Sequence, residues 1–511
     1  MQALHTPQDA ARWLGQRGAV RLCTDSRQVQ RGDAFLAWPG ARHDARRNAA
    51  QVLAQGAVAC LMEAHDLPAS IDLGEDAFAS YPQLKQASGL IADAYYEHPS
   101  HQLDVVAVTG TNGKTSSTWW LAQALTRLGR RCAVVGTLGM GEVCMGAEGM
   151  PVVQGPRTGL TTPDAVVFQG ALRDFVQAGV KACAMEASSI GLMEQRLQGT
   201  RVRVALFTNF TQDHLDYHGS MQAYWEAKRC LFDATDLHAA VVNLDDSKGA
   251  VLVDHLKARG DIPVDRLWTF GETMSARLQA RNIRFASTHG AAWTSGLSFD
   301  VVEGGDTQPL TTPFVGRFNV SNLLGVLASL RALGISLADA VSACQDLLAV
   351  PGRMQTVSMP GQALVVIDYA HTPDALSQAL QSLQPLAQAR GGQLHCVIGC
   401  GGDRDASKRP LMAAAAQTHA GHVVLTSDNP RCEDPLDILR QMQAGLTSAQ
   451  HIQVIVDRAQ AIDRAIEQAQ ACDIVLIAGK GHEDYQEISG VRHPFSDLVQ
   501  ARAALQAKGQ A

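Results

Sequence analysis

Residues 105–117 read VVAVTGTNGKTSS, an apolar run followed by two glycines three residues apart and then by Lys114-Thr115. The β-branched run is typical of a buried strand. Residues 116–128 are compatible with a helix, and a glycine follows them at the usual stop position. The sequence therefore predicts a strand, a phosphate-binding loop and a helix in direct succession.

The chemistry of such a loop follows from its residue types. Glycines allow a tight turn whose backbone N–H groups point into one concavity, and the helix N-terminus adds its positive dipole. Lys114 would reach the outer phosphates, and the Thr115 hydroxyl would ligate Mg²⁺. The pattern G-x-x-G-K-T is shorter than the common G-x-x-x-x-G-K-[ST], but the flanking strand and helix are the context that the motif requires. The chain is expected to bind a nucleoside triphosphate.

Length and composition restrict the class of protein. A chain of 511 residues is too long for one ordinary core and indicates three or four domains. With 46% hydrophobic residues, 18% charged residues and a net charge of −7, it fits a globular enzyme and gives no indication of nucleic acid as partner. No apolar run reaches membrane-spanning length, and residues 1–6 do not begin a signal peptide, so we expect a cytoplasmic protein. Eleven cysteines without a C-x-x-C pair fit reduced thiols, with Cys396 and Cys400 as core residues.

Strands and helices alternate in two regions of the chain, which predicts two parallel sheets with helices on both faces. Residues 1–98 mix short apolar runs with turns, and a helix is expected to begin at Thr162 with Pro163 at its first position. Residues 245–310 show low periodicity and are predicted to be irregular. The other expected strands cover residues 132–135, 182–185, 202–207, 239–244, 364–367, 395–398, 422–425, 452–456 and 474–477.

Polar side chains follow the first group of strands at the edge where ligands bind in parallel sheets. Glu186 follows residues 182–185, should converge with Thr115, and suits a Mg²⁺ ligand. His214 and His218, four residues apart, raise zinc as an alternative, but no Glu follows the first histidine and no thiol is near. Oxygen-rich Mg²⁺ chemistry therefore fits better.

Three further features depend on context for their interpretation. Lys228 lies in a helix expected over residues 221–232, where a lysine alone indicates only a solvated surface. Asn319 and Asn322, one turn apart at the start of a long apolar helix, could bracket a base edge or cap the helix. Residues 351–353 look like an interdomain hinge.

The ends of the second group of strands are rich in charged residues. One interpretation is a set of solvated loops, and the other is a binding surface for a zwitterionic or anionic small molecule. The four segments are residues 368–373, 401–405, 427–431 and 479–484.

Taken together, these motifs resemble the Mur ligases, the ATP-dependent amide ligases that build the stem peptide of bacterial peptidoglycan. The resemblance runs in collinear order over nearly the whole chain and rests on residues 110–115, 186–189, 208–216, 319–322, 351–353 and 368–371. It implies an α/β fold of three domains. These would be a UDP-substrate domain over residues 1–98, a central P-loop ATPase with a mostly parallel sheet over residues 99–350, and a Rossmann-like amino-acid domain over residues 351–511.

Carried over position by position, the resemblance implies the site residues. Catalytic roles fall to Lys114, Glu186, His214 and Lys228, and the metal ligands would be Thr115, Glu186, His214 and Lys228 as a carbamate. The expected ATP contacts are Gly110, Thr111, Asn112, Gly113, Lys114, Thr115, Ser116, Asn319, Asn322, Arg353 and Asp368. The expected UDP-substrate contacts are Thr24, Ser26, Ala41, Arg42, His43, Thr161, Thr162, Ser188, Glu194 and Arg196. Glu194 departs from the family, since a glutamine is expected there, and Ile190 stands where the family often has histidine.

The resemblance also implies the substrates. Residues 428–431, Asp-Asn-Pro-Arg, look like the family's signature for meso-diaminopimelate, and a guanidinium can pair bidentately with the distal carboxylate that lysine lacks. The contacts with this amino acid would be Arg404, Asp428, Asn429, Pro430, Arg431, Gly479 and Glu483. The other substrates would be ATP with Mg²⁺ and UDP-MurNAc-L-Ala-D-Glu, handled by a monomer without nucleic acid or membrane.

Three alternatives stay open at this point. The chain could be the lysine-adding relative, against which Arg431 stands, or a folylpolyglutamate-type ligase, which would not need residues 1–98 for a UDP group. From another class, it could be a binding protein that hydrolyses ATP without ligation. Such a protein would not account for the charged strand ends of the C-terminal part.

Overall fold

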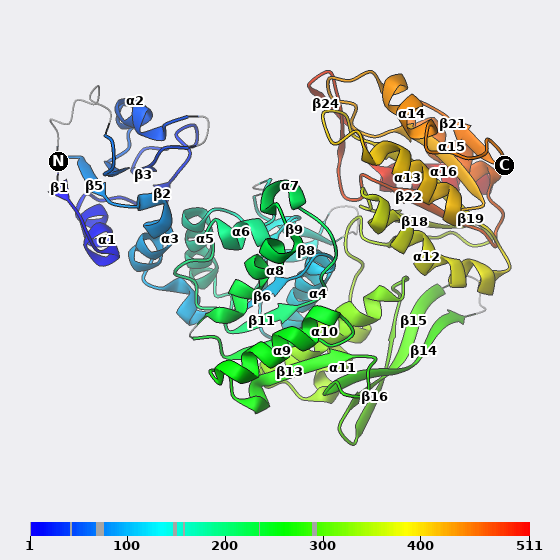
Figure 1. Ribbon diagram of the computed structural model, residues 1–511, viewed down its shortest axis with the longest axis horizontal. Coiled ribbons are helices and arrows are strands. Elements are labelled where there is room, and N and C mark those ends of the chain that lie inside the picture. The colour runs from blue at the N-terminus through cyan, green and yellow to red at the C-terminus, as the bar shows by residue number, and fades with distance from the viewer. Residues whose placement is uncertain are drawn as a thin grey trace. The chain divides into compact units, whose positions relative to one another are not determined.

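The computed structural model describes residues 2–40, 43–67, 76–146, 151–156, 159–234, 236–288 and 294–510 (Figure 1). The chain divides into two compact units. The first contains residues 1–144, 153–278 and 325–343, and the second contains residues 145–152, 279–324 and 344–511.

The first unit begins with a parallel five-stranded sheet in the order β1-β5-β4-β3-β2. Alternate residues of its strands point to opposite faces, so that Leu36 and Leu61 pack in one core and Phe35 and Cys60 in another. Its strands are β1 (Gln2–Ala3), β2 (Arg21–Cys23), β3 (Asp33–Ala37), β4 (Ala59–Glu63) and β5 (Phe78–Tyr81). Its helices are α1 (Pro7–Gln16), α2 (Ala49–Ala54) and α3 (Leu84–Tyr95), with a 3₁₀ turn, η1 (Ala45–Asn48), before α2.

The same unit continues into the predicted α/β sheet, in the order β13-β12-β11-β6-β10-β7-β8. Strands β13 to β7 run parallel, and β8 returns antiparallel beside β7. The strands are β6 (Asp104–Thr109), β7 (Cys132–Gly136), β8 (Gly139–Met145), β10 (Ala182–Glu186), β11 (Val204–Phe207), β12 (Ala239–Asn243) and β13 (Leu267–Gly271). The helices are α4 (Lys114–Arg127), α5 (Ala165–Gln177), α6 (Ser189–Met193), α7 (Leu215–His218), α8 (Met221–Arg229) and α9 (Ser247–Arg259), with 3₁₀ turns η2 (Pro99–Gln102), η3 (Cys230–Asp233) and η4 (Val264–Arg266). The four strands predicted beside the phosphate loop are thereby confirmed.

Two helix boundaries differ from the prediction. The helix expected at Thr162 begins at Ala165, because the Asp164 carboxylate accepts hydrogen bonds from the Val166 and Val167 N–H groups at 3.0 Å and caps the helix there. The helix expected over residues 221–232 ends at Arg229 and continues as the 3₁₀ turn η3.

The prediction of an irregular segment over residues 245–310 is wrong. Besides α9 and β13 it contains β14 (Leu278–Thr288) and β15 (Thr294–Glu303), followed by β16 (Asp306–Thr312), which pairs antiparallel with β15. The alternation was present in β15, where the buried Leu297, Phe299 and Val301 alternate with the half-buried Ser298 and Asp300, and the prediction overlooked it.

The second unit contains the second parallel sheet, in the order β17-β18-β22-β19-β20-β21. Only the edge strand β17 is antiparallel to its neighbour, and buried clusters cover both faces of the sheet. The strands are β17 (Gln355–Val357), β18 (Leu364–Asp368), β19 (Leu394–Cys400), β20 (His422–Ser427), β21 (Ile452–Val454) and β22 (Ile474–Ala478), followed by the hairpin β23 (Tyr485–Ile488) and β24 (Val491–Pro494). The helices are α12 (Pro373–Arg390), α13 (Lys408–His419), α14 (Pro435–Gln443), α15 (Arg458–Gln468) and α16 (Asp497–Gln510). The predicted Rossmann-like sheet is confirmed, while β17 and the hairpin were not predicted.

Two helices, α10 (Phe318–Ala332) and α11 (Leu337–Gln345), contribute residues to both units. Cys396 and Cys400 both lie buried in β19, which confirms their prediction as core residues. In the described part of the chain, no helix combines the length and the apolar character needed to cross a membrane.

Candidate active site

The phosphate loop joins β6 to α4 through two glycines with positive φ, Gly110 at 145° and Gly113 at 84°. A Cβ atom on Gly110 would lie 1.9 Å from the Thr208 hydroxyl, so only glycine allows this approach. The Lys114 ammonium folds over the loop and donates to the carbonyls of Gly110 and Thr111, both at 2.8 Å. The predicted loop residues therefore form one compact turn at the N-terminus of α4.

The segment after β11 holds the loop in place. The Asn209 side chain accepts from the Asn112 N–H at 2.8 Å and donates to the Asn112 carbonyl at 3.1 Å, as a neighbouring strand would. Thr208 adds a hydroxyl hydrogen bond to the same carbonyl at 2.7 Å. These contacts fix the backbone that would face the phosphates without using Lys114 or Thr115.

Thr115 and Glu186 converge as the sequence predicted. The Thr115 hydroxyl donates to Glu186 Oε2 at 3.0 Å, and the Thr137 N–H donates to Oε1 at 2.8 Å. Both Thr115 and Glu186 are buried, and a Cβ on Gly136 would lie 2.3 Å from Glu186 Oε1. Gly136 thus leaves the space that the carboxylate occupies at the end of β10.

Lys228 is buried beneath the loop and is not the surface residue that its helix position alone suggests. It is 1% exposed, its ammonium donates to the Gly110 carbonyl at 2.7 Å, and it lies 4.4 Å from the Tyr224 ring centroid. Burial, together with the nearby charge of Lys114, holds the pKa of Lys228 well below its usual range. The amino groups of Lys114 and Lys228 therefore share one carbonyl oxygen.

His214 lies on the Lys228 side of the loop. Its ring centroid is 6.1 Å from that of Tyr224, and no hydrogen bond joins it to Thr115 or Glu186 in the described part of the chain. Its neighbour His218 contacts the Ser189 hydroxyl at 3.0 Å. Across the described residues no group of three His, Cys, Asp or Glu side chains is arranged to hold a metal.

The residues predicted for the muramoyl-dipeptide form a continuous network with Glu186. The Thr162 hydroxyl donates to the Glu186 carbonyl at 2.8 Å and contacts the Ser188 hydroxyl at 2.9 Å. Arg196 donates to the Thr162 carbonyl at 2.8 Å, and Thr137 reaches Thr161 at 3.4 Å. The structure thus brings these predicted residues together beside the phosphate loop.

Glu194 has a partner that the sequence did not indicate. Lys85 of α3 pairs with it at 2.6 Å, and the Tyr217 hydroxyl donates to it at 2.8 Å. The hydrogen bonds from Lys85 and Tyr217 lower the pKa of Glu194. Its negative charge is therefore compensated, and the contact links the N-terminal sheet's α3 to the segment after α6.

The Lys85–Glu194 pair should contribute little to stability, because both side chains are partly exposed. We expect Glu194→Gln and Lys85→Gln each to lower the free energy of unfolding by less than about 1 kcal/mol, with a coupling energy of about 0.2–1 kcal/mol. Urea denaturation of the two single variants and the double variant measures this coupling. Strictly additive effects would contradict the pairing.

The residues predicted to hold the UDP group gather near the end of β2. The Asn48 amide donates to the Ser26 hydroxyl at 2.8 Å and its oxygen lies 3.3 Å from His43 Nε2. Thr24 donates to Asp164, the cap of α5, at 3.3 Å. Ala41 and Arg42 lie outside the described residues.

In the second unit, Asn319 and Asn322 are both buried and bonded to each other. The Asn322 amide donates to Asn319 Oδ1 at 3.0 Å, and the Asn319 amide donates to the Val315 carbonyl at 2.8 Å. The Arg353 guanidinium stacks 4.7 Å above the Tyr369 ring. Asp368 accepts from the Met354 and Ala370 N–H groups at 2.8 and 2.9 Å, and burial raises its pKa.

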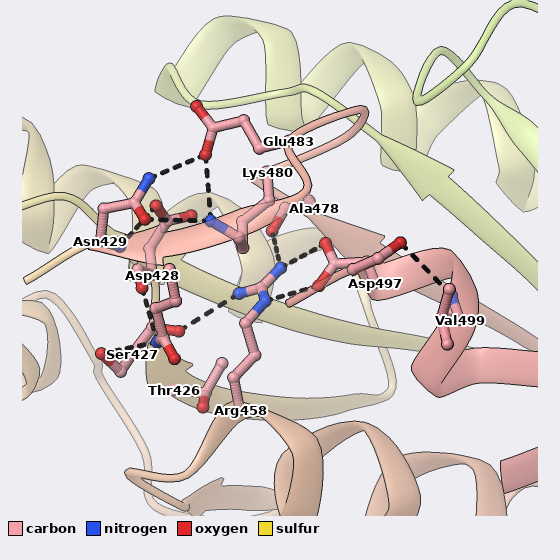
Figure 2. A network of polar contacts seen from close by, with 12 residues as sticks. Thr426, Ser427, Asp428, Asn429, Arg458, Ala478, Lys480, Glu483, Asp497 and Val499 are labelled. Atoms are coloured by element: carbon pink, nitrogen blue, oxygen red, sulfur yellow. Dashed lines mark hydrogen bonds and ion pairs between the residues drawn. The ribbon is translucent and has the colours of Figure 1, made fainter. Parts of the chain in front are cut away.

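The predicted acceptor residues form a polar network at the carboxyl ends of β20 and β22 (Figure 2). Asn429 donates to Glu483 at 2.8 Å, and the fully buried Lys480 donates to both Asn429 and Glu483 at 3.1 and 3.0 Å. A Cβ on Gly479 would lie 2.6 Å from Asp428 Oδ2. Lys480 was not among the predicted contacts, although it positions two residues that were.

Arg431 has a left-handed backbone with φ 51° and donates to the Gly402 carbonyl at 2.6 Å. Its Nε lies 3.9 Å from Glu487. A Cβ on Gly401 would lie 2.9 Å from its Nη1, so this glycine leaves room for the guanidinium. Arg404 is exposed on the loop that follows Gly402, and Pro430 precedes Arg431 at the loop's turn.

Comparison with known proteins agrees with this geometry. The Mur ligase middle domain matches residues 108–330, and the Mur ligase glutamate ligase domain matches residues 352–481. A protein of Acidovorax sp. (strain JS42), named UDP-N-acetylmuramoyl-L-alanyl-D-glutamate–2,6-diaminopimelate ligase, is 53% identical over 519 residues, which cover 100% of this chain and 99% of that relative. The chain belongs to the Mur ligase family.

Two further Mur ligases extend the comparison. A relative of the same name from Janthinobacterium sp. (strain Marseille) is 46% identical over 96% of each chain. A solved structure of a ligase with that name is 37% identical, covers 96% of each chain and superposes with a TM-score of 0.66. The α/β fold with a phosphate-loop domain is thus that of a Mur ligase.

Proposed function

We propose that this Mur ligase joins meso-2,6-diaminopimelate to UDP-N-acetylmuramoyl-L-alanyl-D-glutamate with ATP as energy source, in the cytoplasmic synthesis of peptidoglycan precursors. The observation that carries the proposal is the 53% identity, over the whole chain, to a relative with the name of that ligase. Residues 1–98, 99–350 and 351–511 would hold the UDP group, ATP and the amino acid, respectively, in a monomer that needs neither nucleic acid nor membrane.

The reaction requires activation of a carboxylate before an amide can form in water. The D-glutamyl side-chain carboxylate attacks the γ-phosphorus of ATP, which gives an acyl phosphate and ADP. The amine of diaminopimelate then adds to the acyl carbon, and the tetrahedral intermediate releases phosphate. Lys114 and the loop N–H groups would offset charge on the transferring phosphoryl group, and no protein nucleophile is needed.

The side chains beside the loop fit Mg²⁺. Thr115 and Glu186 present oxygen atoms 3.0 Å apart at a buried strand end, the donor type that this ion prefers. The ion would neutralise phosphate charge there. His214 and Lys228 remain predicted ligands on the other side of the loop, and Asn319, Asn322, Arg353 and Asp368 remain predicted nucleotide contacts.

Lys228 is proposed to be carbamylated, since its lowered pKa favours the neutral amine that adds to CO₂. The amine nitrogen would bond to the carbon of CO₂ and release one proton, which leaves an anionic carbamate. We expect protein treated with ¹³C-bicarbonate to show a carbamate carbonyl resonance that Lys228→Gln lacks and that Lys181→Gln, at a more exposed lysine, retains. The same resonance in all three proteins, or in none, would contradict the modification.

The proposed activity is tested with ATP, UDP-MurNAc-L-Ala-D-Glu and either meso-diaminopimelate or lysine. We expect a UDP-tripeptide, ADP and phosphate in equal amounts with diaminopimelate, and little product with lysine. Preferential incorporation of lysine would overturn the assignment of the acceptor. ATP hydrolysis at the same rate with and without UDP-MurNAc-L-Ala-D-Glu and the amino acid would favour the binding protein that hydrolyses ATP without ligation.

A further inference from the structure

The amino edge of the central sheet, opposite the phosphate loop, carries a row of basic side chains. Five of its parallel strands, β7, β10, β11, β12 and β13, each follow directly after a basic residue. These residues are Arg131, Lys181, Arg203, His238 and Arg266. Since parallel strands begin at the same edge of a sheet, these residues lie along one edge. One carboxylate interrupts it, Asp104 at the start of β6.

A cavity of about 180 Å³ opens at this edge. A water molecule takes about 30 Å³, so the cavity has room for a small hydrated ligand. Its lining is largely polar and comes from η2, the start of β6 and the segment before β11. The lining residues are His101, Gln102, Leu103, Asp104, Arg201 and Arg203.

Positive charge exceeds negative charge around the cavity. Asp104 is shared by two arginines, with Arg203 at 2.5 Å and Arg130 at 3.5 Å. Arg201 takes part in no ion pair within the described part of the chain, although its N–H donates to the buried Ser100 hydroxyl at 3.0 Å, which fixes its backbone. The cavity lining therefore holds one carboxylate and two guanidinium groups, and the carboxylate is also paired with a third, that of Arg130.

Two further observations indicate that an anion would be favoured here. The Nε of Arg203 is buried and has no hydrogen-bond partner among the described residues, which is costly for a guanidinium donor. The pKa of His238 lies below its usual value, first because of burial and then because of the charges of Arg266, Arg203 and Arg201. The electrostatic potential at this edge of the sheet is thus positive and disfavours additional positive charge.

We propose that this cavity binds a phosphate group, as a site separate from the nucleotide-binding loop. A phosphate dianion matches the excess charge, and its oxygens accept from guanidinium donors in the paired geometry that arginine favours. The same chemistry would serve inorganic phosphate and a phosphate monoester. Neither role depends on the ligase activity proposed above.

The test is a titration of the full-length protein with inorganic phosphate, at constant ionic strength, observed through the histidine imidazoles by NMR. We expect the His101 and His238 resonances to shift and the pKa of His238 to rise, because the bound anion offsets the nearby arginines. Arg201→Gln should weaken phosphate binding about tenfold, the size of a lost charge-assisted hydrogen bond. Arg203→Lys keeps the positive charge but loses the two parallel N–H donors of the guanidinium, so it should also weaken phosphate binding.

Arg131→Gln is the matched control, because this arginine belongs to the same row but is paired with Glu142 at 2.6 Å and does not line the cavity. It should bind phosphate like the wild type. Ribose 5-phosphate distinguishes the sources: equal shifts indicate a site open to monoesters, and shifts with inorganic phosphate alone indicate a site for the free ion. Shifts no larger than those caused by chloride, or equal affinity in Arg201→Gln, would overturn the proposal.

Discussion

Lys114→Ala is expected to reduce ATP-dependent ligation by about a hundred- to a thousandfold, the usual cost of removing one preorganised donor from a transferring phosphoryl group. The ammonium lies over the loop, 2.8 Å from the Gly110 and Thr111 carbonyls, so it needs no rearrangement of the backbone to meet phosphates there. The loop should keep its shape in the variant, because Thr208 and Asn209 hold Asn112 independently of Lys114. The loss should therefore appear in turnover and not in folding.

ADP release and UDP-tripeptide formation, measured together with the thermal unfolding of the protein, check this expectation. Lys181→Ala is the matched control, since Lys181 lies on the opposite edge of the same sheet, directly before β10. A variant that retains ligation within about threefold of wild type would show that the phosphates do not depend on Lys114. Loss of folding in Lys114→Ala alone would instead give the lysine a structural role.

The parts of the fold that the sequence predicted are those in which local signals agree. Between residues 105 and 128, strand propensity, glycine spacing and helix propensity all indicate one arrangement, and the structure follows it from β6 to α4. At Thr162 two local signals competed, proline at a first helical position and a capping aspartate one residue later. The cap at Asp164 determined the start of α5.

The parts of the site that escaped prediction depend on side-chain contacts that no motif in the sequence indicates. Asn48 links Ser26 to His43, Tyr224 lies beside both Lys228 and His214, and Lys480 bonds to Asn429 and Glu483. A single asparagine, tyrosine or lysine that positions other site residues belongs to no sequence motif by which it could be recognised. The burial of Lys228 was hidden for the same reason, because its partner, the Gly110 carbonyl, lies 118 residues away in sequence.

The residues at the ends of β20 and β22 illustrate both cases. The sequence showed that these residues are charged, but it did not show which ion pairs and hydrogen bonds compensate their charges. Arg458 forms a fully buried pair with Asp497 at 2.7 Å and donates to the Ser427 and Ala478 carbonyls at 3.4 and 3.0 Å, which connects the ends of β20 and β22 (Figure 2). These hydrogen bonds fix the carboxyl ends of β20 and β22 relative to each other. The predicted acceptor residues that follow these strands are therefore held in place.

Arg431→Ala is expected to lower kcat/KM for meso-diaminopimelate by about a hundredfold or more, with a smaller loss for lysine. A guanidinium that pairs with the distal carboxylate of the acceptor contributes a charge-assisted, bidentate contact, and loss of one partner of such a pair costs about 2–5 kcal/mol. Lysine has no carboxylate at that position and so loses little. The ratio between the two acceptors should therefore fall steeply.

The backbone at Arg431 adds a second consideration, because its φ of 51° is strained for most residues. Arg431→Lys keeps a comparable backbone preference and the positive charge but lacks the two parallel N–H donors of the guanidinium. If bidentate pairing discriminates diaminopimelate from lysine, this variant should be more active than Arg431→Ala but less active than the wild type. Arg440→Ala provides a control at an exposed arginine paired with Asp437 on α14. An unchanged preference for diaminopimelate over lysine in Arg431→Ala would mean that the distal carboxylate is recognised elsewhere, and the loop at residues 401–405 with Arg404 would then be the next place to look.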